Sequence, residues 1–164
     1  MSSSDQKKLD QVKSLRRSGK TDEAISILTE LLSDHPSSAE ANCLMAWCLD
    51  SLGREREAIP HYEAAIANGI QGEERKGTYL GLGSTLRCLG QYEKSLEVFE
   101  KAIGEFPEHR ALKVFRAMVL HNLGRSSEGL GVLILELLDT TTDEEIRTYD
   151  RALRFYADKL DQTW

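Results

Sequence analysis

The feature that most constrains this chain is an internal repeat of about 34 residues. The dipeptide Leu-Gly occurs at residues 52–53, 89–90 and 123–124, and Ser18-Gly19 is a weaker earlier copy, so successive copies are 34, 37 and 34 residues apart. A period of this length is typical of arrays of small supersecondary units, each of which buries its apolar face against its neighbours. The three additional residues of the second interval are expected in the connection Gly69-Ile70-Gln71-Gly72, since a loop absorbs them at little cost.

The spacing inside each copy predicts a helical hairpin. After each Gly, a small residue opens a series of apolar positions at i, i+4 and i+7, as in Ser95, Phe99 and Ala102 of the third copy. Such spacing places the side chains on one face of a helix. The Gly supplies the turn between two helices, and Pro36 and Pro107 stop the second helix in two of the copies. The chain is therefore expected to be all-α.

The full order of residues in a copy resembles the tetratricopeptide repeat family. In the third copy this order is Tyr79, Leu82, Gly83, Leu86, Gly90, Ser95, Phe99, Ala102 and Pro107. The resemblance implies an all-α, right-handed superhelical stack of about four helix-turn-helix hairpins. The expected hairpins cover residues 5–37, 39–71, 76–108 and 110–140 of a single domain over residues 1–164. Atypical first and last copies are expected, because terminal repeats lack a neighbour on one side.

Residues 143–161 depart from the repeat pattern but predict one further helix. Thr142 followed by Glu145 is the signature of a capping box. An apolar stripe follows at helical steps, formed by Ile146, Tyr149, Leu153, Tyr156 and Leu160. We expect this helix to cap the last hairpin by covering the apolar segment 130–138. The alternative is that it docks into another subunit or into the groove.

Charge and apolar content limit the possible partners. The chain has 21 basic and 27 acidic side chains and a formal net charge of −6, which disfavours binding to nucleic acid through the overall field. The first 20 residues are locally basic, with six basic and two acidic side chains. No aromatic platform accompanies them, so no nucleic-acid partner is expected.

The longest apolar stretch, residues 130–135, is far below the roughly twenty residues that a membrane-spanning helix needs. The N-terminal residues lack the apolar core of a secretory signal, so we expect a cytoplasmic protein without a membrane partner. Cys43, Cys48 and Cys88 form no Cys-x-x-Cys pair and are expected to be reduced.

The sequence contains no catalytic or metal-binding constellation. The four histidines lack metal-ligand spacing, no Gly-rich loop follows a strand, and no nucleophile has an activating base nearby in the pattern. We therefore expect no enzymatic activity, no cofactor and no metal.

A binding surface remains, and the family resemblance indicates where it lies. In this family the first helices of successive repeats line a concave groove, and the positions that face it recur with the repeat. The candidate partner-binding residues are Lys13, Trp47, Ser84 and Met118 in one row, Arg16, Asp50, Arg87 and His121 in a second, and Cys43, Leu80 and Val114 in a third. The alternative is that Trp47, Val114 and Met118 belong to the core.

The family's carboxylate clamp is absent, because its positions are occupied by Leu9, Lys13, Leu44, Gly77 and Gly81. We infer a different ligand, an extended or helical peptide with an apolar anchor near Trp47 and acidic groups near Lys13, Arg16 and Arg87. The predicted function is a non-enzymatic protein-interaction scaffold or adaptor. Two alternatives stay open: a homo-oligomer formed through the C-terminal helices, and, more remotely, a small-molecule binder or enzyme built on the repeat.

Overall fold

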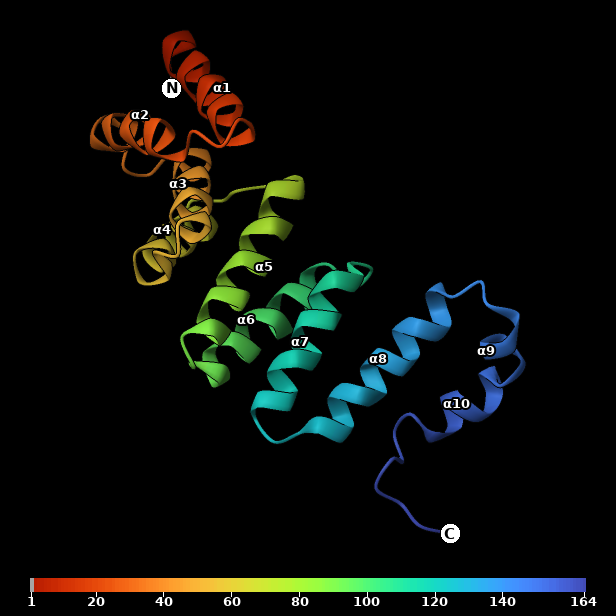
Figure 1. The fold of residues 1–164 in the computed structure, drawn as a ribbon. Helices are drawn as coiled ribbons and strands as arrows, with labels where there is room; N and C mark the ends of the chain where they lie inside the picture. Colours follow the sequence, from red (N-terminus) through yellow and green to blue (C-terminus); the bar gives the residue numbers. More distant parts are fainter. Residues whose placement is uncertain (1) are drawn as a thin grey trace. The chain divides into compact units, whose positions relative to one another are not determined.

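The computed structural model describes residues 2–164, and helices are the only regular secondary structure in that range (Figure 1). The first eight helices correspond in chain order to the four predicted hairpins. They are α1 (Ser3–Arg17), α2 (Thr21–Asp34), α3 (Ala39–Ser51), α4 (Glu55–Ala67), α5 (Gly72–Cys88), α6 (Tyr92–Glu105), α7 (Arg110–Asn122) and α8 (Ser126–Thr140). The predicted all-α class is confirmed.

A glycine with a left-handed backbone turns the chain between the two helices of each pair. Gly19, Gly53, Gly90 and Gly124 have φ angles of +75°, +70°, +73° and +76°. A side chain would make this conformation costly. The recurring Gly therefore marks the hairpin turn, as the sequence predicts.

The three additional residues of the second interval lie in a helix, which corrects the expectation of a longer loop. The connection between α4 and α5 is residues 68–71, as long as the connections at residues 35–38 and 106–109. Instead, α5 has 17 residues where α3 and α7 have 13. Helix α5 thus begins at Gly72, one turn before the expected start of the third repeat at residue 76. Glu73 and Glu74 in its first turn favour this extension through the helix dipole.

The structure divides into two compact units, an N-terminal unit that reaches to Gly90 and a C-terminal unit of Gln91–Trp164. In the N-terminal unit, the predicted small and apolar positions of α2 and α4 are buried. Leu28 of α2 and Ala58, Tyr62 and Ala65 of α4 are fully inaccessible to solvent. Helix α5 packs closely against α4, because a Cβ atom on Gly81 would lie 2.5 Å from the Tyr62 hydroxyl oxygen.

The C-terminal unit has a core of its own. Phe99 of α6 is fully buried, and its ring centroid lies 6.2 Å from that of Phe115 of α7. Gly129 allows α8 to approach α7, since a Cβ atom there would lie 2.7 Å from the Ala117 carbonyl oxygen. The absence of a side chain at residue 129 therefore sets the distance between α7 and α8.

The prediction of one capping helix over residues 143–161 is wrong in its extent. The segment forms two short helices, α9 (Glu144–Thr148) and α10 (Asp150–Tyr156), separated at Tyr149. Asp143, rather than Thr142, caps α9, and its carboxylate accepts a hydrogen bond from the Ile146 backbone N–H at 3.1 Å. Helix α10 ends at Tyr156, just before the backbone of Ala157 packs on α8. The approach is close, since a Cβ atom on Gly131 would collide with the Ala157 carbonyl oxygen. The end of α10 thus coincides with the closest approach of this segment to α8.

Among residues 2–164, no helix combines the length and the apolar character needed to cross a lipid bilayer.

The contact between α5 and Tyr62 predicts a large difference between two Gly-to-Ala substitutions. Gly81→Ala places a methyl group 2.5–2.8 Å from the buried Tyr62 side chain, so we expect a loss of about 1–3 kcal/mol in the free energy of unfolding. Gly104→Ala is the matched control, because no atom lies within 4 Å of the added Cβ in α6; there we expect a gain of about 0.4–1 kcal/mol. Urea denaturation followed by circular dichroism measures both. Equal stability of the two variants would contradict the packing described here.

Candidate functional site

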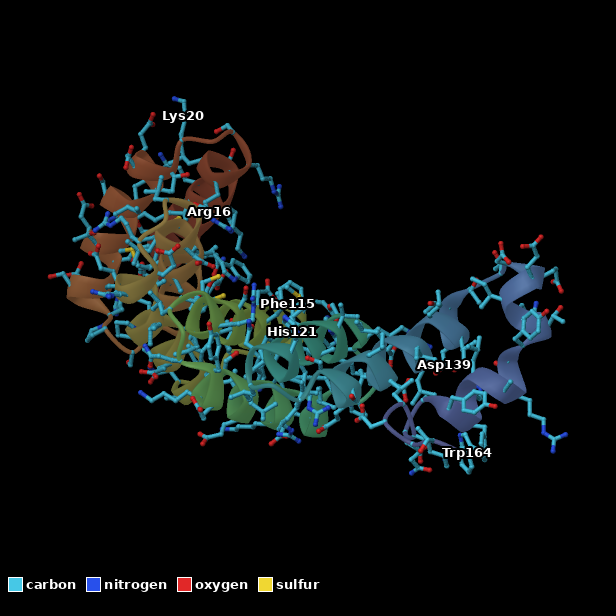
Figure 2. The ribbon with its side chains drawn as sticks, turned by 60° about the horizontal axis from the view of Figure 1, so that its bottom comes forward. Arg16, Lys20, Phe115, His121, Asp139 and Trp164 are labelled. Carbon is cyan, nitrogen blue, oxygen red and sulfur yellow. The ribbon has the colours of Figure 1, made fainter. Side chains whose placement is uncertain are left out.

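Three of the predicted groove residues, Arg16 of α1 and Trp47 and Asp50 of α3, meet at one pocket in the N-terminal unit. The Arg16 guanidinium lies 4.9 Å from the centroid of the Trp47 ring, a distance suited to cation–π attraction. Together with Asp50 and Ser51, these two side chains line a shallow, open pocket of about 480 Å³. Figure 2 shows Arg16 on α1, with Lys20 just beyond the end of this helix. The pocket therefore combines a cation and an aromatic surface.

Trp47 is both a packing residue and a surface residue. A Cβ atom on Gly77 of α5 would lie 3.0 Å from Cζ2 of Trp47, so the indole contacts the backbone of α5. The Trp47 side chain nevertheless stays partly exposed, and the Arg16 guanidinium stacks on its ring. The core interpretation of Trp47 and the groove interpretation thus each describe part of its environment.

Asp50 connects three helices. The Tyr62 hydroxyl of α4 donates a hydrogen bond to one carboxylate oxygen at 3.0 Å, and the Thr85 hydroxyl of α5 donates to the other at 3.1 Å. Burial, with a further contribution from the Asp50 charge, raises the pKa of Tyr62 well above its usual value, so the phenol remains a donor. Asp50 therefore positions α4 and α5 beneath the pocket.

The remaining predicted residues of the N-terminal unit differ in accessibility. The Lys13 ammonium lies 2.6 Å from the Glu40 carboxylate, and this hydrogen bond raises the pKa of Lys13. Leu80, Ser84 and Arg87 of α5 are partly buried. The prediction that Cys43 faces the groove is wrong. Its side chain is 1% exposed, and its Sγ lies 3.2 Å from the Thr78 hydroxyl. The inward face of α3 at this position packs against α5, so Cys43 belongs to the core.

Three further predicted residues lie on α7 in the C-terminal unit. Val114 and Met118 are 36% and 39% exposed, so the alternative that they are core residues is wrong. His121 is exposed, and its Nδ1 lies 3.0 Å from the Ser126 hydroxyl (Figure 2). These side chains make an accessible row on α7.

Several residues that shape the pocket are absent from the predicted set. Gly77 and Tyr62 support Trp47 and Asp50, Thr85 completes the hydrogen bonds of Asp50, and Ser51 lines the pocket. The signal for Gly77 was visible, because Gly77 and Gly81 are four residues apart in one helix and mark a close helix–helix approach. No cluster of His, Cys, Asp or Glu side chains that could hold a metal ion occurs within residues 2–164.

The family assignment follows from comparison with known sequences. The sequence model described as "Tetratrico peptide repeat" matches residues 3–60 and 40–160. The chain belongs to the tetratricopeptide repeat family. A curated relative is "Superkiller protein 3" of Saccharomyces cerevisiae (strain ATCC 204508 / S288c), which is 31% identical over 93 residues. The match covers 57% of this chain but only 6% of the relative's length.

Solved structures confirm the fold class. The chain superposes on "MamA RS-1 ArsTM double mutant" with a TM-score of 0.74 and 13% identity, covering 100% of this chain and 99% of that one. The structure titled "Crystal structure of YrrB: a TPR protein with an unusual peptide-binding site" has a TM-score of 0.73 and 16% identity, over 93% of this chain and 80% of that one. "Crystal structure of MamA protein" has a TM-score of 0.70 and 18% identity, over 98% of this chain and 78% of that one.

The hydrogen bonds of Asp50 predict a structural cost for its removal. Asp50→Ala leaves the Tyr62 and Thr85 hydroxyls without their acceptor, and we expect a loss of about 1–3 kcal/mol in the free energy of unfolding. Asp50→Asn keeps one acceptor oxygen and is expected to lose less. Urea denaturation of both variants beside the wild type measures the difference. An Asp50→Ala variant as stable as the wild type would show that these hydrogen bonds do not hold the helices together.

The environments of the three cysteines predict a hierarchy of thiol reactivity. Burial raises the pKa of Cys43 to about 11 and also raises the pKa of Cys48, whereas Cys88 is exposed. At pH 8 a thiol-specific reagent should therefore modify Cys88 of the native chain first, because only the thiolate reacts and access is required. Mass spectrometry of partly labelled protein identifies the site, and unfolding in urea should make all three cysteines reactive. Early labelling of Cys43 would contradict its burial.

Proposed function

We propose that this chain is a non-enzymatic interaction module that binds an acidic peptide segment of a partner protein in the pocket lined by Arg16, Trp47, Asp50 and Ser51. The observation that carries the proposal is the stacking of the Arg16 guanidinium on the partly exposed Trp47 ring. An aromatic ring beside a cation suits a ligand with one large apolar side chain and a neighbouring carboxylate.

The surrounding charges favour an acidic ligand. Helix α1 carries Lys7, Lys8, Lys13, Arg16 and Arg17 against two acidic side chains. Glu40 is paired with Lys13, and Asp50 accepts hydrogen bonds from the Tyr62 and Thr85 hydroxyls while keeping its negative charge. An incoming carboxylate therefore meets the Arg16 guanidinium at the pocket itself, and the basic side chains of α1 add a longer-range attraction that supports a fast encounter.

The glycines of α5 argue against the family's conventional carboxylate clamp. Gly77 and Gly81 occupy two of its positions, and the Trp47 and Tyr62 side chains fill the space beside them. Neither position can therefore offer a charged side chain. A similar solved structure, YrrB, is titled as having an unusual peptide-binding site, which supports peptide binding on this fold by other means. The cytoplasmic location expected from the sequence fits a scaffold or adaptor role and is part of this proposal.

The proposal is tested by peptide binding to single-site variants. An array of immobilised dodecapeptides of random sequence is probed with the full chain, and we expect selected peptides to combine Asp or Glu with one aromatic or leucine side chain. Arg16→Glu and Trp47→Ala should each weaken binding of a selected peptide by at least about tenfold, equivalent to about 1.4 kcal/mol. Arg17→Glu, an exposed neighbour of Arg16 on the same helix, is the matched control and should retain most of the binding.

Fluorescence of Trp47 gives an independent readout. In a Trp164→Phe background Trp47 is the single tryptophan, so peptide binding at the pocket should change its emission. Equal binding by the wild type, Arg16→Glu and Trp47→Ala, or a selected peptide that leaves the emission unchanged, would refute this pocket as the binding site.

A further inference from the structure

One repeat position differs between α8 and the second helices of the other hairpins. The apolar residue four positions after the small residue is Leu28 in α2, Tyr62 in α4 and Phe99 in α6, and all three are 0% exposed. The equivalent residue of α8 is Leu133, which is 38% exposed. A position that is fully buried in three copies is therefore open in the fourth.

The contacts explain the difference. The helix that follows the hairpin covers this position in the second and third copies: Gly81 of α5 contacts Tyr62, and Phe115 of α7 packs near Phe99. After α8, the chain approaches through Ala157 at Gly131. At about 100° per residue, Gly131 and Leu133 point roughly 160° apart around the helix. Helices α9 and α10 contain no buried residue, so Leu133 remains uncovered.

Leu133 is part of a continuous apolar face. Leu130, Leu133 and Leu137 are 51%, 38% and 47% exposed and follow one another at i, i+3 and i+7, which places them on one side of α8. We call these three residues the α8 leucine stripe. An exposed stripe of leucines in a helix is the usual form of a helix–helix contact surface.

The acidic residues of α8 are paired with basic side chains. Glu128 pairs with Arg116 and Arg125, and Glu136 pairs with Arg110 and Lys113. Asp139, labelled in Figure 2, pairs with Arg154. By helical position, Glu128 and Asp139 lie on the side of α8 opposite the stripe, whereas Glu136, three residues after Leu133, borders the stripe but is only 9% exposed. Two stripes can therefore meet without opposing like charges.

The other helix that could extend the array in a second molecule is α1, and its accessible face is polar. The exposed side chains along α1 are Ser3, Ser4, Gln6, Lys7, Asp10, Gln11, Ser14 and Arg17. A head-to-tail contact between α8 and the α1 helix of another copy would bury these groups against leucine, at the cost of their hydration. A second α8 stripe offers a matching apolar surface instead.

We propose that the α8 leucine stripe is a homodimer interface, in which the stripe of one copy packs antiparallel on the same stripe of a second copy across a two-fold axis. Such an isologous contact is closed and self-complementary. The interface is narrow, so the dimer is expected to be reversible, with a Kd on the order of 10–100 µM. This surface belongs to the C-terminal unit and shares no residue with the Arg16–Trp47 pocket.

Sedimentation equilibrium of the full chain tests the proposal. The wild type should show a mass that rises with concentration from 18.4 kDa toward twice that value, and Leu133→Glu and Leu137→Glu should stay monomeric to about ten times the wild-type Kd. Each substitution enters a two-fold interface twice, so its effect is doubled. Leu135→Glu is the matched control, because Leu135 is 38% exposed on the same helix but outside the stripe, and it should dimerise like the wild type.

Three results would overturn the homodimer. The first is a wild type that is still monomeric at about 500 µM, well above the expected Kd. The second is equal weakening of dimerisation by Leu133→Glu and Leu135→Glu, and the third is assembly beyond the dimer, which indicates an open head-to-tail contact. Helical content by circular dichroism checks folding, and Leu133→Gln provides a milder variant that should also weaken dimerisation. Arg16→Glu should dimerise normally, so failure of the peptide-binding proposal and failure of this one are distinguishable.

Discussion

The close approach of α5 to α3 and α4 is the contact on which the candidate site depends. It is possible because residues 77 and 81 have no side chain: Trp47 lies against Gly77, and the Tyr62 ring fills the space at Gly81. The same approach brings Thr85 and Tyr62 to the two oxygens of Asp50. Trp47 then has a fixed orientation in which one side packs on α5 while Arg16 stacks on the ring. Small residues within a helix thus determine a surface formed by their neighbours.

Repeats were predictable from the sequence because a hairpin imposes local requirements that recur. The turn needs a left-handed residue, hence Gly19, Gly53 and Gly124, and the second helix needs a small residue and a large one four positions apart. These requirements act within about 34 residues and leave a periodic trace. The same register identified Arg16, Trp47 and Asp50 as neighbours on successive first helices, and the structure brings these three together at one pocket.

The parts that were not predictable depend on contacts between segments that the periodicity does not encode. Cys43 is on the predicted face, but the approach of α5 buries it beside Thr78. The longer α5 could not be distinguished from a longer loop, because the interval between glycines gives the number of residues but not their conformation. In the C-terminal segment the apolar spacing predicts one helix, whereas the structure has two short helices, and the second ends at Tyr156, where Ala157 approaches Gly131. A pattern of side chains cannot reveal where two backbones will touch.

The same nearest-neighbour logic relates the two proposed surfaces. In a repeat array each second helix is stabilised by the helix that follows it, and a position that lacks such a neighbour retains apolar surface that association can bury. The α8 leucine stripe has this property. The pocket at Trp47, by contrast, already lies between α1 and α5, and its remaining exposed surface suits a smaller ligand. A dimer formed through the stripe would carry two such pockets on one assembly. A partner with two acidic segments on a linker long enough to span both pockets would then gain affinity through effective concentration, without any change in either pocket.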